Sequence, residues 1–410
     1  MYLFKQKLLW VSAASLALTA CGGSSSSSSS SEEEHDISIL VSQSNTTSLS
    51  LLEEGALETL DEAAAGNGAK LVLSENGAFA AVLANGTVNF VHGLHEEEEG
   101  EEAHEEDEHE EAHVLTHNLT GTDIAVVPSN GHFAVLVDGD TTFIEYAELE
   151  NETPATEDTS GLSVDEVYPA LMLDEAHDLK LVFDGTNAKV FEANTEEYSF
   201  ACANPSSHGQ TSELVVVSCD EGAVSLLIEE GETEHVITSE VLADLDGVDE
   251  DYIWRAQGHV IAGFVPNSTD YAIVEHDETN GILVVKGSDD GTNVFSENIC
   301  DLQLDTTDGD VLTLTAGGKF VALDHEGAVL KTIALDESAQ TSCGDLVLAS
   351  ASKAVVVIDN NVLKGYGIDV DEPETNPAGY HVHERFDLNV SDIASMVIFH
   401  EVGETHDHAH

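Results

Sequence analysis

Short pairs of apolar, β-branched segments repeat along the chain, and this repetition is the strongest constraint on its fold. Each repeat has an Asp, Gly or His beside an apolar segment, then a turn, then a second apolar segment. Examples are AKLVLSENGAFAAVLANG, TDIAVVPSNGHFAVLVDG and YPALMLDEAHDLKLVFDG. The repeats begin near residues 69, 122, 168, 202, 258, 300 and 343, a spacing of roughly 34 to 56 residues. This period is close to that of a four-stranded propeller blade.

An all-β β-propeller is therefore predicted. The segment SDIASMVIFHEV at Ser391–Val402 looks like one more innermost strand, and strands at Ile37–Val41 and Leu49–Leu52 could complete its blade and close the ring. Eight blades result, with seven as the alternative. A pair of β-sandwiches is the other architecture considered, but it does not account for the period. Only Leu57–Ala65 has the pattern of a short helix.

The N-terminal residues predict a lipoprotein. Lys5 and Lys7 precede an apolar run at Leu8–Leu18, and the sequence Leu18-Thr19-Ala20-Cys21 forms a lipobox. Residues 1–20 are thus expected to be a signal peptide, with lipidation at Cys21 and a Ser/Glu-rich tether at 21–35. The propeller would occupy residues 36–403 and a His-rich tail residues 404–410. By resemblance to proteobacterial lipoproteins, in which Gly rather than Asp after the lipidated cysteine is compatible with sorting to the outer membrane, Gly22 implies a periplasmic lipoprotein anchored there.

Composition limits the partners. The chain carries 80 acidic and 12 basic residues, a formal charge of −68, so nucleic acid is excluded as a partner. A hydrophobic content of 41% is enough for a large core. We expect a monomer whose lipid contact is confined to the Cys21 anchor.

Four cysteines remain once Cys21 is assigned to lipid, and an even number in an oxidising compartment predicts two disulfides. Cys202 is expected to begin the first strand of its repeat and Cys219 to end the second, so antiparallel pairing places them side by side. Cys300 and Cys343 are expected to open the innermost strands of successive blades. The predicted pairs are Cys202–Cys219 and Cys300–Cys343.

A His/Glu-rich insertion at about residues 92–117 is the clearest functional signal. Six imidazoles are spaced through a dense run of carboxylates: His92, His95, His104, His109, His113 and His117. Imidazole nitrogen and carboxylate oxygen together form the ligand set of a borderline divalent metal, Zn²⁺ above all. The alternative is a solvated acidic loop, but solvation alone needs only Glu and Asp.

Other histidines are weaker metal candidates. His132, His177 and His208 are expected near the far ends of innermost strands in consecutive blades, where they could converge. If Tyr380–Arg385 is a strand, His381 and His383 share one face and could bind one ion. His406 and His408 alternate in the tail, which could instead be a disordered terminus or a tag remnant. Polar residues expected at the starts of innermost strands are Asp123, His259, Asp301, Asp345 and Asp392, and most of these should only meet water.

In order along residues 70–410, several motifs resemble the AztD family of periplasmic zinc metallochaperones. They are the His-rich insertion, SNGHFAVLVDG, Cys202 followed by His208-Gly209 and Cys219-Asp220-Glu221-Gly222, Gly258-His259, and the closing Gly403-Glu404-Thr405-His406-Asp407-His408. The resemblance implies a β-propeller that receives zinc and passes it to the substrate-binding protein of a zinc ABC transporter. It also implies that His208, His259 and the insertion histidines are zinc ligands. The acid-rich stretch Glu96–Glu111 and the lipobox depart from that family.

The sequence also bears on two other classes of function. The sequence has no nucleophile elbow, P-loop, HExxH or Rossmann motif, so we do not expect an enzyme. A membrane-anchored acidic scaffold is the alternative, with a loop that binds calcium or a basic partner. Calcium prefers oxygen ligands alone, so loop histidines distinguish this alternative from zinc binding.

Overall fold

The computed structural model describes most of residues 38–399. The ranges it describes are 38–53, 56–60, 67–93, 112–151, 153–162, 164–229, 235–242, 245, 252–277, 281–286, 294–305, 309–334, 343, 349–351, 354–359, 362–370, 380–390 and 392–399. No helix in these ranges has the length and apolarity that crossing a bilayer requires. The signal peptide, Cys21, the tether and the tail predicted from the sequence lie outside the described residues.

The described strands form eight four-stranded antiparallel sheets. In the order β3-β2-β1-β32, the first sheet joins both ends of the described chain: β1 (Ser38–Gln43), β2 (Leu49–Glu53), β3 (Ala56–Thr59) and β32 (Ile393–Phe399). The next three sheets in chain order are β4 (Lys70–Leu73), β5 (Phe79–Ala84), β6 (Thr87–His92) and β7 (His113–Thr120); β8 (Ile124–Ser129), β9 (His132–Val137), β10 (Asp140–Glu145) and β11 (Thr156–Asp158); and β12 (Tyr168–Asp174), β13 (Leu179–Phe183), β14 (Asn187–Glu192) and β15 (Thr195–Ala201).

Four further sheets follow with the same order of strands. They are β16 (Ser207–Gln210), β17 (Leu214–Cys219), β18 (Gly222–Glu229) and β19 (Val236–Val241); β20 (Ile253–Gln257), β21 (Val260–Phe264), β22 (Tyr271–Asp277) and β23 (Gly281–Lys286); β24 (Ile299–Leu304), β25 (Val311–Thr315), β26 (Lys319–Leu323) and β27 (Val329–Ala334); and β28 (Ala349–Ala351), β29 (Ala354–Asp359), β30 (Val362–Val370) and β31 (Tyr380–Asn389). Two single-turn 3₁₀ helices, η2 (Tyr146–Glu148) and η3 (Ser160–Leu162), flank β11.

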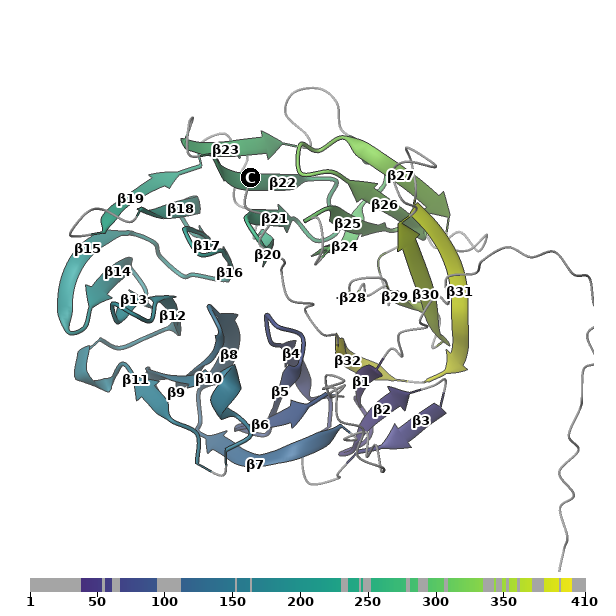
Figure 1. Cartoon of the computed structure of the whole chain (residues 1–410), viewed down its shortest axis with the longest axis horizontal. Helices are drawn as coiled ribbons and strands as arrows, with labels where there is room; N and C mark the ends of the chain where they lie inside the picture. The colour runs from purple at the N-terminus through teal and green to yellow at the C-terminus, as the bar shows by residue number, and fades with distance from the viewer. Residues whose placement is uncertain are drawn as a thin grey trace, which may run out of the picture. The chain divides into compact units, whose positions relative to one another are not determined.

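The sheets are arranged radially around one axis, so the predicted all-β β-propeller is confirmed (Figure 1). Strands β4, β8, β12, β16, β20, β24, β28 and β32 lie nearest the axis, and the fourth strand of each sheet lies at the rim (Figure 1). The last strand, β32, pairs antiparallel with β1, from Ser38 opposite Phe399 to Gln43 opposite Ile393. Eight sheets is the larger of the two blade numbers considered from the sequence.

Two details of the predicted secondary structure are wrong. The expected helix at Leu57–Ala65 is replaced over its first residues by β3, in which Leu57 lies opposite Leu52. The cause is tertiary: β3 completes the edge of the closing blade, and this pairing outweighs the helical tendency of a Leu/Glu/Ala segment. Two innermost strands were also misplaced, because β16 begins at Ser207 and β20 at Ile253 rather than near 202 and 258.

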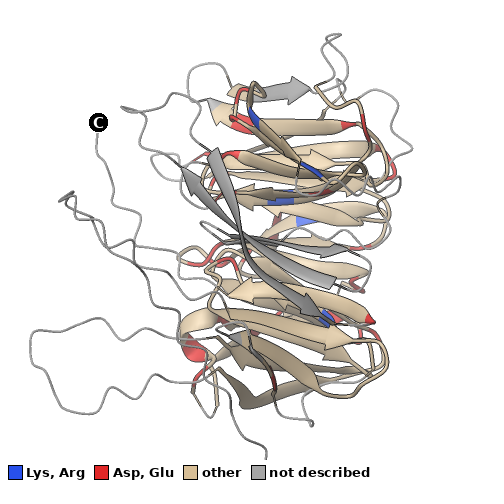
Figure 2. Ribbon diagram, turned by 90° about the vertical axis from the view of Figure 1, so that its right-hand side faces the viewer, with Lys and Arg blue, Asp and Glu red and all other residues tan. Residues whose placement is uncertain are grey.

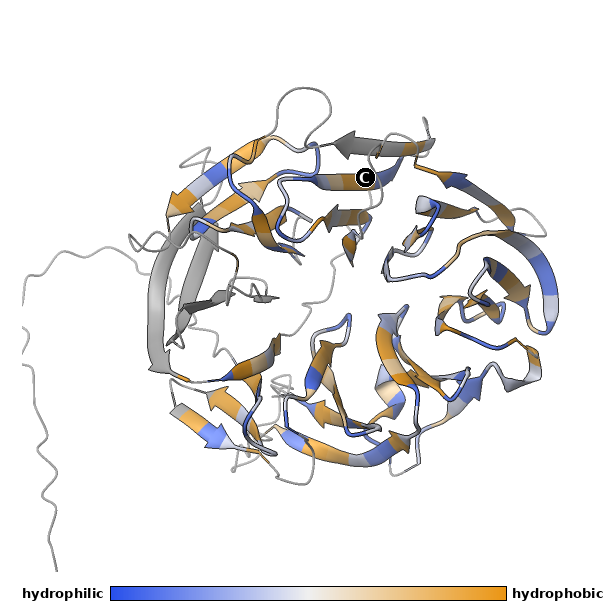
Figure 3. Ribbon diagram, turned by 180° about the vertical axis from the view of Figure 1, so that it is seen from behind, coloured by the Kyte–Doolittle hydropathy of each residue, from blue (hydrophilic) through white to orange (hydrophobic). Residues whose placement is uncertain are grey.

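The core lies between neighbouring blades. One buried cluster joins Leu171 and Leu181 of the β12–β15 blade to Val215 and Val217 of the β16–β19 blade. Similar clusters lie between the other neighbouring blades from the closing blade round to the β24–β27 blade, among the residues whose side chains the structure describes. Figure 3 shows apolar residues concentrated on the inner strands, whereas the rim strands β15 and β19 alternate between exposed and half-buried residues.

Trp254 shows how closely the inner strands pack. Its side chain is almost fully buried, and its indole N–H donates a 2.9 Å hydrogen bond to the Ser218 hydroxyl of the neighbouring blade. Gly263 lies opposite Trp254 in the sheet, and a Cβ there would come within 2.4 Å of the indole ring. Glycine is therefore required at this position.

Both predicted disulfides are present, linking Cys202 to Cys219 and Cys300 to Cys343. Cys219 ends β17 as expected, but Cys202 precedes β16, and Cys343 precedes β28. The pairings were predictable because each needs only the approach of neighbouring chain segments. Exact strand boundaries were not needed.

Within each antiparallel sheet, the turn between the first and second strands and the connection between the third and fourth lie at the same end. We call the side of the ring that carries these connections the site side. The predicted His/Glu-rich insertion connects β6 to β7, the third and fourth strands of their sheet, so its anchors Gly93 and Ala112 lie on this side. Figure 2 shows the acidic residues of the described chain mainly at turns and strand ends, with few basic residues among them.

Candidate metal centre

Asp174, His177 and His235 bring three possible metal-binding atoms together on the site side. These atoms all lie within 4.8 Å of one another, and no other three such atoms among the described residues come this close together. Asp174 ends β12, His177 lies in the turn to β13, and His235 directly precedes β19 of the next blade. The group therefore bridges two neighbouring blades.

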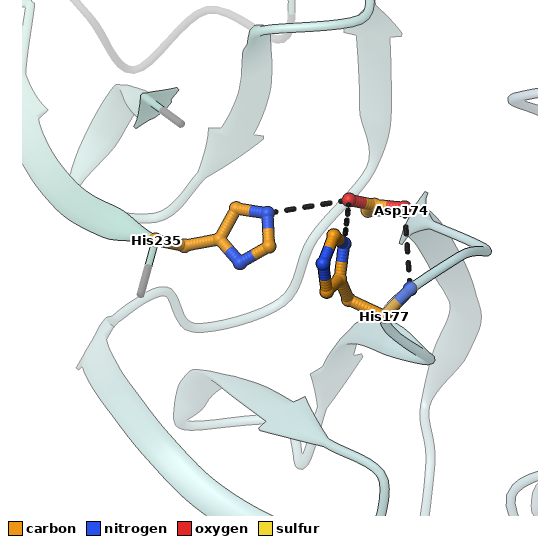
Figure 4. A group of neighbouring side chains, drawn as sticks. All are labelled: Asp174, His177 and His235. Atoms are coloured by element: carbon orange, nitrogen blue, oxygen red, sulfur yellow. Dashed lines mark hydrogen bonds and ion pairs between the residues drawn. The ribbon is translucent and has the colours of Figure 1, made fainter. Parts of the chain in front are cut away.

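Local backbone structure orients the carboxylate. Its Oδ1 atom accepts hydrogen bonds from the backbone N–H groups of Ala176 (2.8 Å) and His177 (3.4 Å), which is the pattern of an Asp-initiated turn. Its Oδ2 atom is then directed at both imidazoles: it lies 2.7 Å from His177 Nδ1 and 3.2 Å from His235 Nε2. Figure 4 shows the two rings approaching the same oxygen from different blades. Their centroids are 4.7 Å apart and their planes nearly perpendicular.

The electrostatics favour an ionised carboxylate. Burial raises the pKa of Asp174, but the hydrogen bond and charge of His177, together with the two backbone N–H donors, outweigh burial and hold this pKa below its ordinary value. The Asp174 and His177 side chains are 24% and 53% exposed, whereas that of His235 is 10% exposed. The site is thus anchored on its His235 side and open to solvent on its His177 side.

Two imidazole nitrogens and one carboxylate oxygen form a donor set that suits zinc. Neighbouring ligands around tetrahedral zinc lie about 3.3 Å apart when metal–ligand distances are about 2.0–2.1 Å. The 2.7 and 3.2 Å separations here need only a small expansion to admit an ion. Three protein ligands leave a fourth position for water or for a ligand from another molecule.

His132, another predicted ligand, lies next to this group. It begins β9, is 5% exposed, and its Nδ1–H donates a 2.8 Å hydrogen bond to the Asn130 carbonyl. Its Nε2 atom lies 4.0 Å from a carboxylate oxygen of Glu175, the residue after Asp174. Glu75 accepts hydrogen bonds from the backbone N–H groups of Asn130 and Gly131, just before His132, and burial raises the pKa of this carboxyl.

The ends of the predicted insertion lie in strands. His92 ends β6 directly opposite His113, which begins β7; their rings are 5.6 Å apart and nearly perpendicular. His92 Nδ1 lies 3.0 Å from a Glu150 carboxylate oxygen. His117, farther along β7, stacks on Phe90, and burial lowers its pKa. His95, His104 and His109 lie outside the described residues.

His208 is in a different setting from the one predicted. It is the second residue of β16 rather than a residue at the far end of an innermost strand, so it does not converge with His132 and His177. Its Nε2–H donates to the Pro128 carbonyl (3.2 Å), and its Nδ1 accepts from the Tyr168 hydroxyl (3.0 Å). Burial, aided by the charge of Arg255, lowers the pKa of His208 to about 4.

His259 also departs from its predicted position. It lies in the turn between β20 and β21, after the innermost strand, whereas Asp123 and Asp392 directly precede β8 and β32. His259 therefore lies at the opposite end of the innermost strands from these aspartates. The error arose because β20, with Arg255 and Gln257, reads as polar sequence, and the apolar run begins only at Val260.

The remaining predicted residues are spread over the ring. Asp301 lies in β24, and its carboxylate accepts from the Leu302 backbone N–H. Tyr380–Arg385 is indeed part of a strand, β31, in which His381 and His383 lie opposite Asp369 and Gly367. Asp345, His406 and His408 lie outside the described residues.

Sequence reasoning found His177 but missed Asp174 and His235. The spacing of Asp174 and His177 in Asp-Glu-Ala-His offered a local signal, because an aspartate three residues before a turn histidine can reach its ring. His235 offered none: it is 58 residues from His177 (235 minus 177), and only the stacking of consecutive blades brings the two together.

Fold and site together define an all-β propeller that carries a His/Asp donor group between two blades on one side of its ring. Among solved structures, the chain is similar to AztD from Citrobacter koseri. It matches both a crystal structure of that protein and its apo form with a TM-score of 0.65 and 14% sequence identity, over 88% of this chain and 97% of that chain. At this identity the similarity concerns the fold. No protein-family model matches the sequence, and no curated protein matches it.

Proposed function

We propose that this protein is a zinc-binding metallochaperone that holds its cargo at Asp174, His177 and His235. The observation that carries the proposal is the approach of both imidazoles to one ionised carboxylate oxygen. A calcium site is disfavoured, because calcium prefers oxygen ligands alone and two of these three ligands are nitrogens. In this proposal zinc is the ion that the protein transports, not a resident cofactor.

Capture is assigned to the His/Glu-rich insertion. His95, His104 and His109, amid many carboxylates, would bind zinc weakly and rapidly, and the net charge of −68 would raise the local concentration of cations. The anchors of the insertion lie on the same side of the ring as Asp174, His177 and His235. Zinc would pass from the insertion to the better-ordered site without input of energy, because transfer runs from weaker to stronger binding.

The proposal also covers where the protein lies in the cell and which protein receives its zinc. The lipobox ending at Cys21 supports a periplasmic lipoprotein held at the outer membrane. By resemblance to the AztD metallochaperones, the acceptor would be the substrate-binding protein of a zinc ABC transporter. A tether at the outer membrane restricts direct delivery to the inner membrane, so a soluble periplasmic acceptor fits this arrangement.

The test is a zinc titration of the full chain in competition with a chelator, comparing the parent with the double variant His177→Gln/His235→Gln. Removing two ligands should weaken the tightest zinc equivalent by more than the roughly 10- to 100-fold that loss of a supporting hydrogen bond costs. His276→Gln is the matched control: this histidine is also largely buried and paired with a carboxylate, Glu213, at 2.7 Å. Equal affinity in the parent and the double variant would refute the assignment of the site.

A further inference from the structure

A second pair of histidines occupies the equivalent place two blades farther around the ring. His177 lies in the turn after an innermost strand, and His235 lies in the connection before the fourth strand of the next blade. His259 likewise lies in the turn between β20 and β21, and His325 lies in the connection between β26 and β27 of the next blade. The two rings are 6.4 Å apart, with an angle of 64° between their planes.

A carboxylate completes this second group, as Asp174 does the first. Glu275, near the end of β22, lies opposite Val260, the residue that follows His259. One of its oxygens, Oε1, lies 3.8 Å from His259 Nε2. This oxygen is buried and has no hydrogen-bond partner among the described residues. A buried carboxylate oxygen that lacks a hydrogen bond is costly unless a cation satisfies it.

From this geometry we infer a second zinc site formed by His259, His325 and Glu275. It has the same two-nitrogen, one-oxygen donor set as the first group and the same position between consecutive blades. Its imidazoles are farther apart than those of the first group, so zinc must draw them together by side-chain rotation. Both histidines are free to do so, since the His259 side chain is 73% exposed and His325 is also exposed.

The differences between the two sites suggest different roles. Ordering two exposed side chains costs conformational entropy, which the first group largely avoids because His235 is already buried. The second site should therefore bind zinc more weakly and exchange it faster. Its exposure leaves the open coordination position accessible to a ligand from another protein, as a site of release requires. This role rests on the proposed metallochaperone function; the existence of the site does not.

Anomalous diffraction at the zinc absorption edge, on zinc-soaked crystals of the full chain, locates bound zinc directly. The expected result for the parent is a peak bounded by His259, His325 and Glu275. In the double variant His259→Gln/His325→Gln this peak should vanish while the peak at Asp174 remains. A peak at Asp174 with none at Glu275 in the parent would overturn the second site. A peak at Glu275 with none at Asp174 would support it and refute the site of the proposed function.

A titration in solution supplies an independent test. His259→Gln/His325→Gln should lose one zinc equivalent of intermediate affinity and keep the tightest one. Glu275→Gln should weaken the same equivalent, because an amide oxygen carries no net charge to attract the cation. His276→Gln is the matched control, since His276 neighbours Glu275 on β22 but points to the opposite face of the sheet. Equal numbers of zinc equivalents in the parent and the His259/His325 variant would contradict the proposal.

Discussion

Hydrogen-bond partners decide which imidazoles of this chain can take a metal. Both ring nitrogens of His208 are engaged inside the core, by the Tyr168 hydroxyl and the Pro128 carbonyl, so metal binding would break two buried hydrogen bonds. His177 is half exposed, and its partner is a carboxylate that can itself become a ligand. His177 can therefore exchange a proton for a metal ion at little cost, whereas His208 supports the fold.

This difference predicts how acid affects the stability of the protein. Burial lowers the pKa of His208 from 6.5 to about 4. The stabilisation that neutral His208 adds to the free energy of unfolding is therefore complete above about pH 6.5 and is lost as the pH falls toward 4. Over that interval, the free energy of unfolding of the parent should fall by about 3 kcal/mol more than that of His208→Gln. Urea denaturation at a series of pH values measures this difference.

The exposed residue His325 provides the control for that experiment. His325→Gln removes an exposed imidazole, so it measures how much the loss of any histidine changes the pH dependence, and the effect of His208→Gln is compared with it. If His208→Gln also kept the pH dependence of the parent, the neutral, hydrogen-bonded state assigned to His208 would be wrong.

At the scale of elements, the paired ends of β6 and β7 define where the blade stops on either side of the insertion. His92 and His113 lie directly opposite each other, and the pairing continues to Thr87 and Thr120. Gly93 donates a backbone hydrogen bond to Ala78 and leaves no space for a Cβ beside Phe399, and Ala112 is buried in the core. Residues 93 and 112 thus belong to the blade, so we expect an exchange confined to residues 94–111 to leave the pairing of β6 with β7 unchanged.

Replacing residues 94–111 with an Asn-Gly turn should therefore leave the fold and the tightest zinc equivalent intact. The variant should lose the weaker zinc equivalents and take up zinc more slowly at low concentration, because His95, His104 and His109 are removed. Circular dichroism checks the fold, and stopped-flow mixing with a zinc indicator measures uptake. Unchanged zinc stoichiometry and uptake would end the capture model.

Which elements could be predicted depended on the range of the interactions that form them. The apolar strand pairs and both disulfides could be inferred, since each depends on local periodicity or on neighbouring blades. The start of strand β20 was misplaced because Arg255 and Gln257 interrupt the apolar pattern expected of an innermost strand. Strand β3 was mistaken for a helix because its conformation depends on pairing with β2. Two of the three site residues, Asp174 and His235, were likewise missed, and His235 meets Asp174 only through the packing of neighbouring blades.

At the scale of the whole molecule, the dominant property is charge. With a formal charge of −68 at pH 7, like charges repel across the folded surface and favour expansion. The thermal unfolding midpoint at neutral pH should therefore rise as NaCl is increased from about 0.01 to about 1 M, because the Debye length falls from about 30 to about 3 Å. Scanning calorimetry measures the shift.

The same series of NaCl concentrations, measured at low pH, provides a control. Near the sequence pI of about 4.1 the net charge is close to zero, so the salt effect should largely disappear. A salt response of equal size at both pH values would mean that screening of net charge is not its cause.

The central claim is that the propeller itself holds zinc between two of its blades. The most direct measurement is the metal content, by mass spectrometry, of protein with residues 94–111 replaced, purified without chelator or affinity tag. The account predicts bound zinc in this protein and its loss when His177→Gln and His235→Gln are added. A preparation that stays free of zinc after exposure to micromolar zinc at neutral pH, or that keeps all of its zinc after both substitutions, would contradict it.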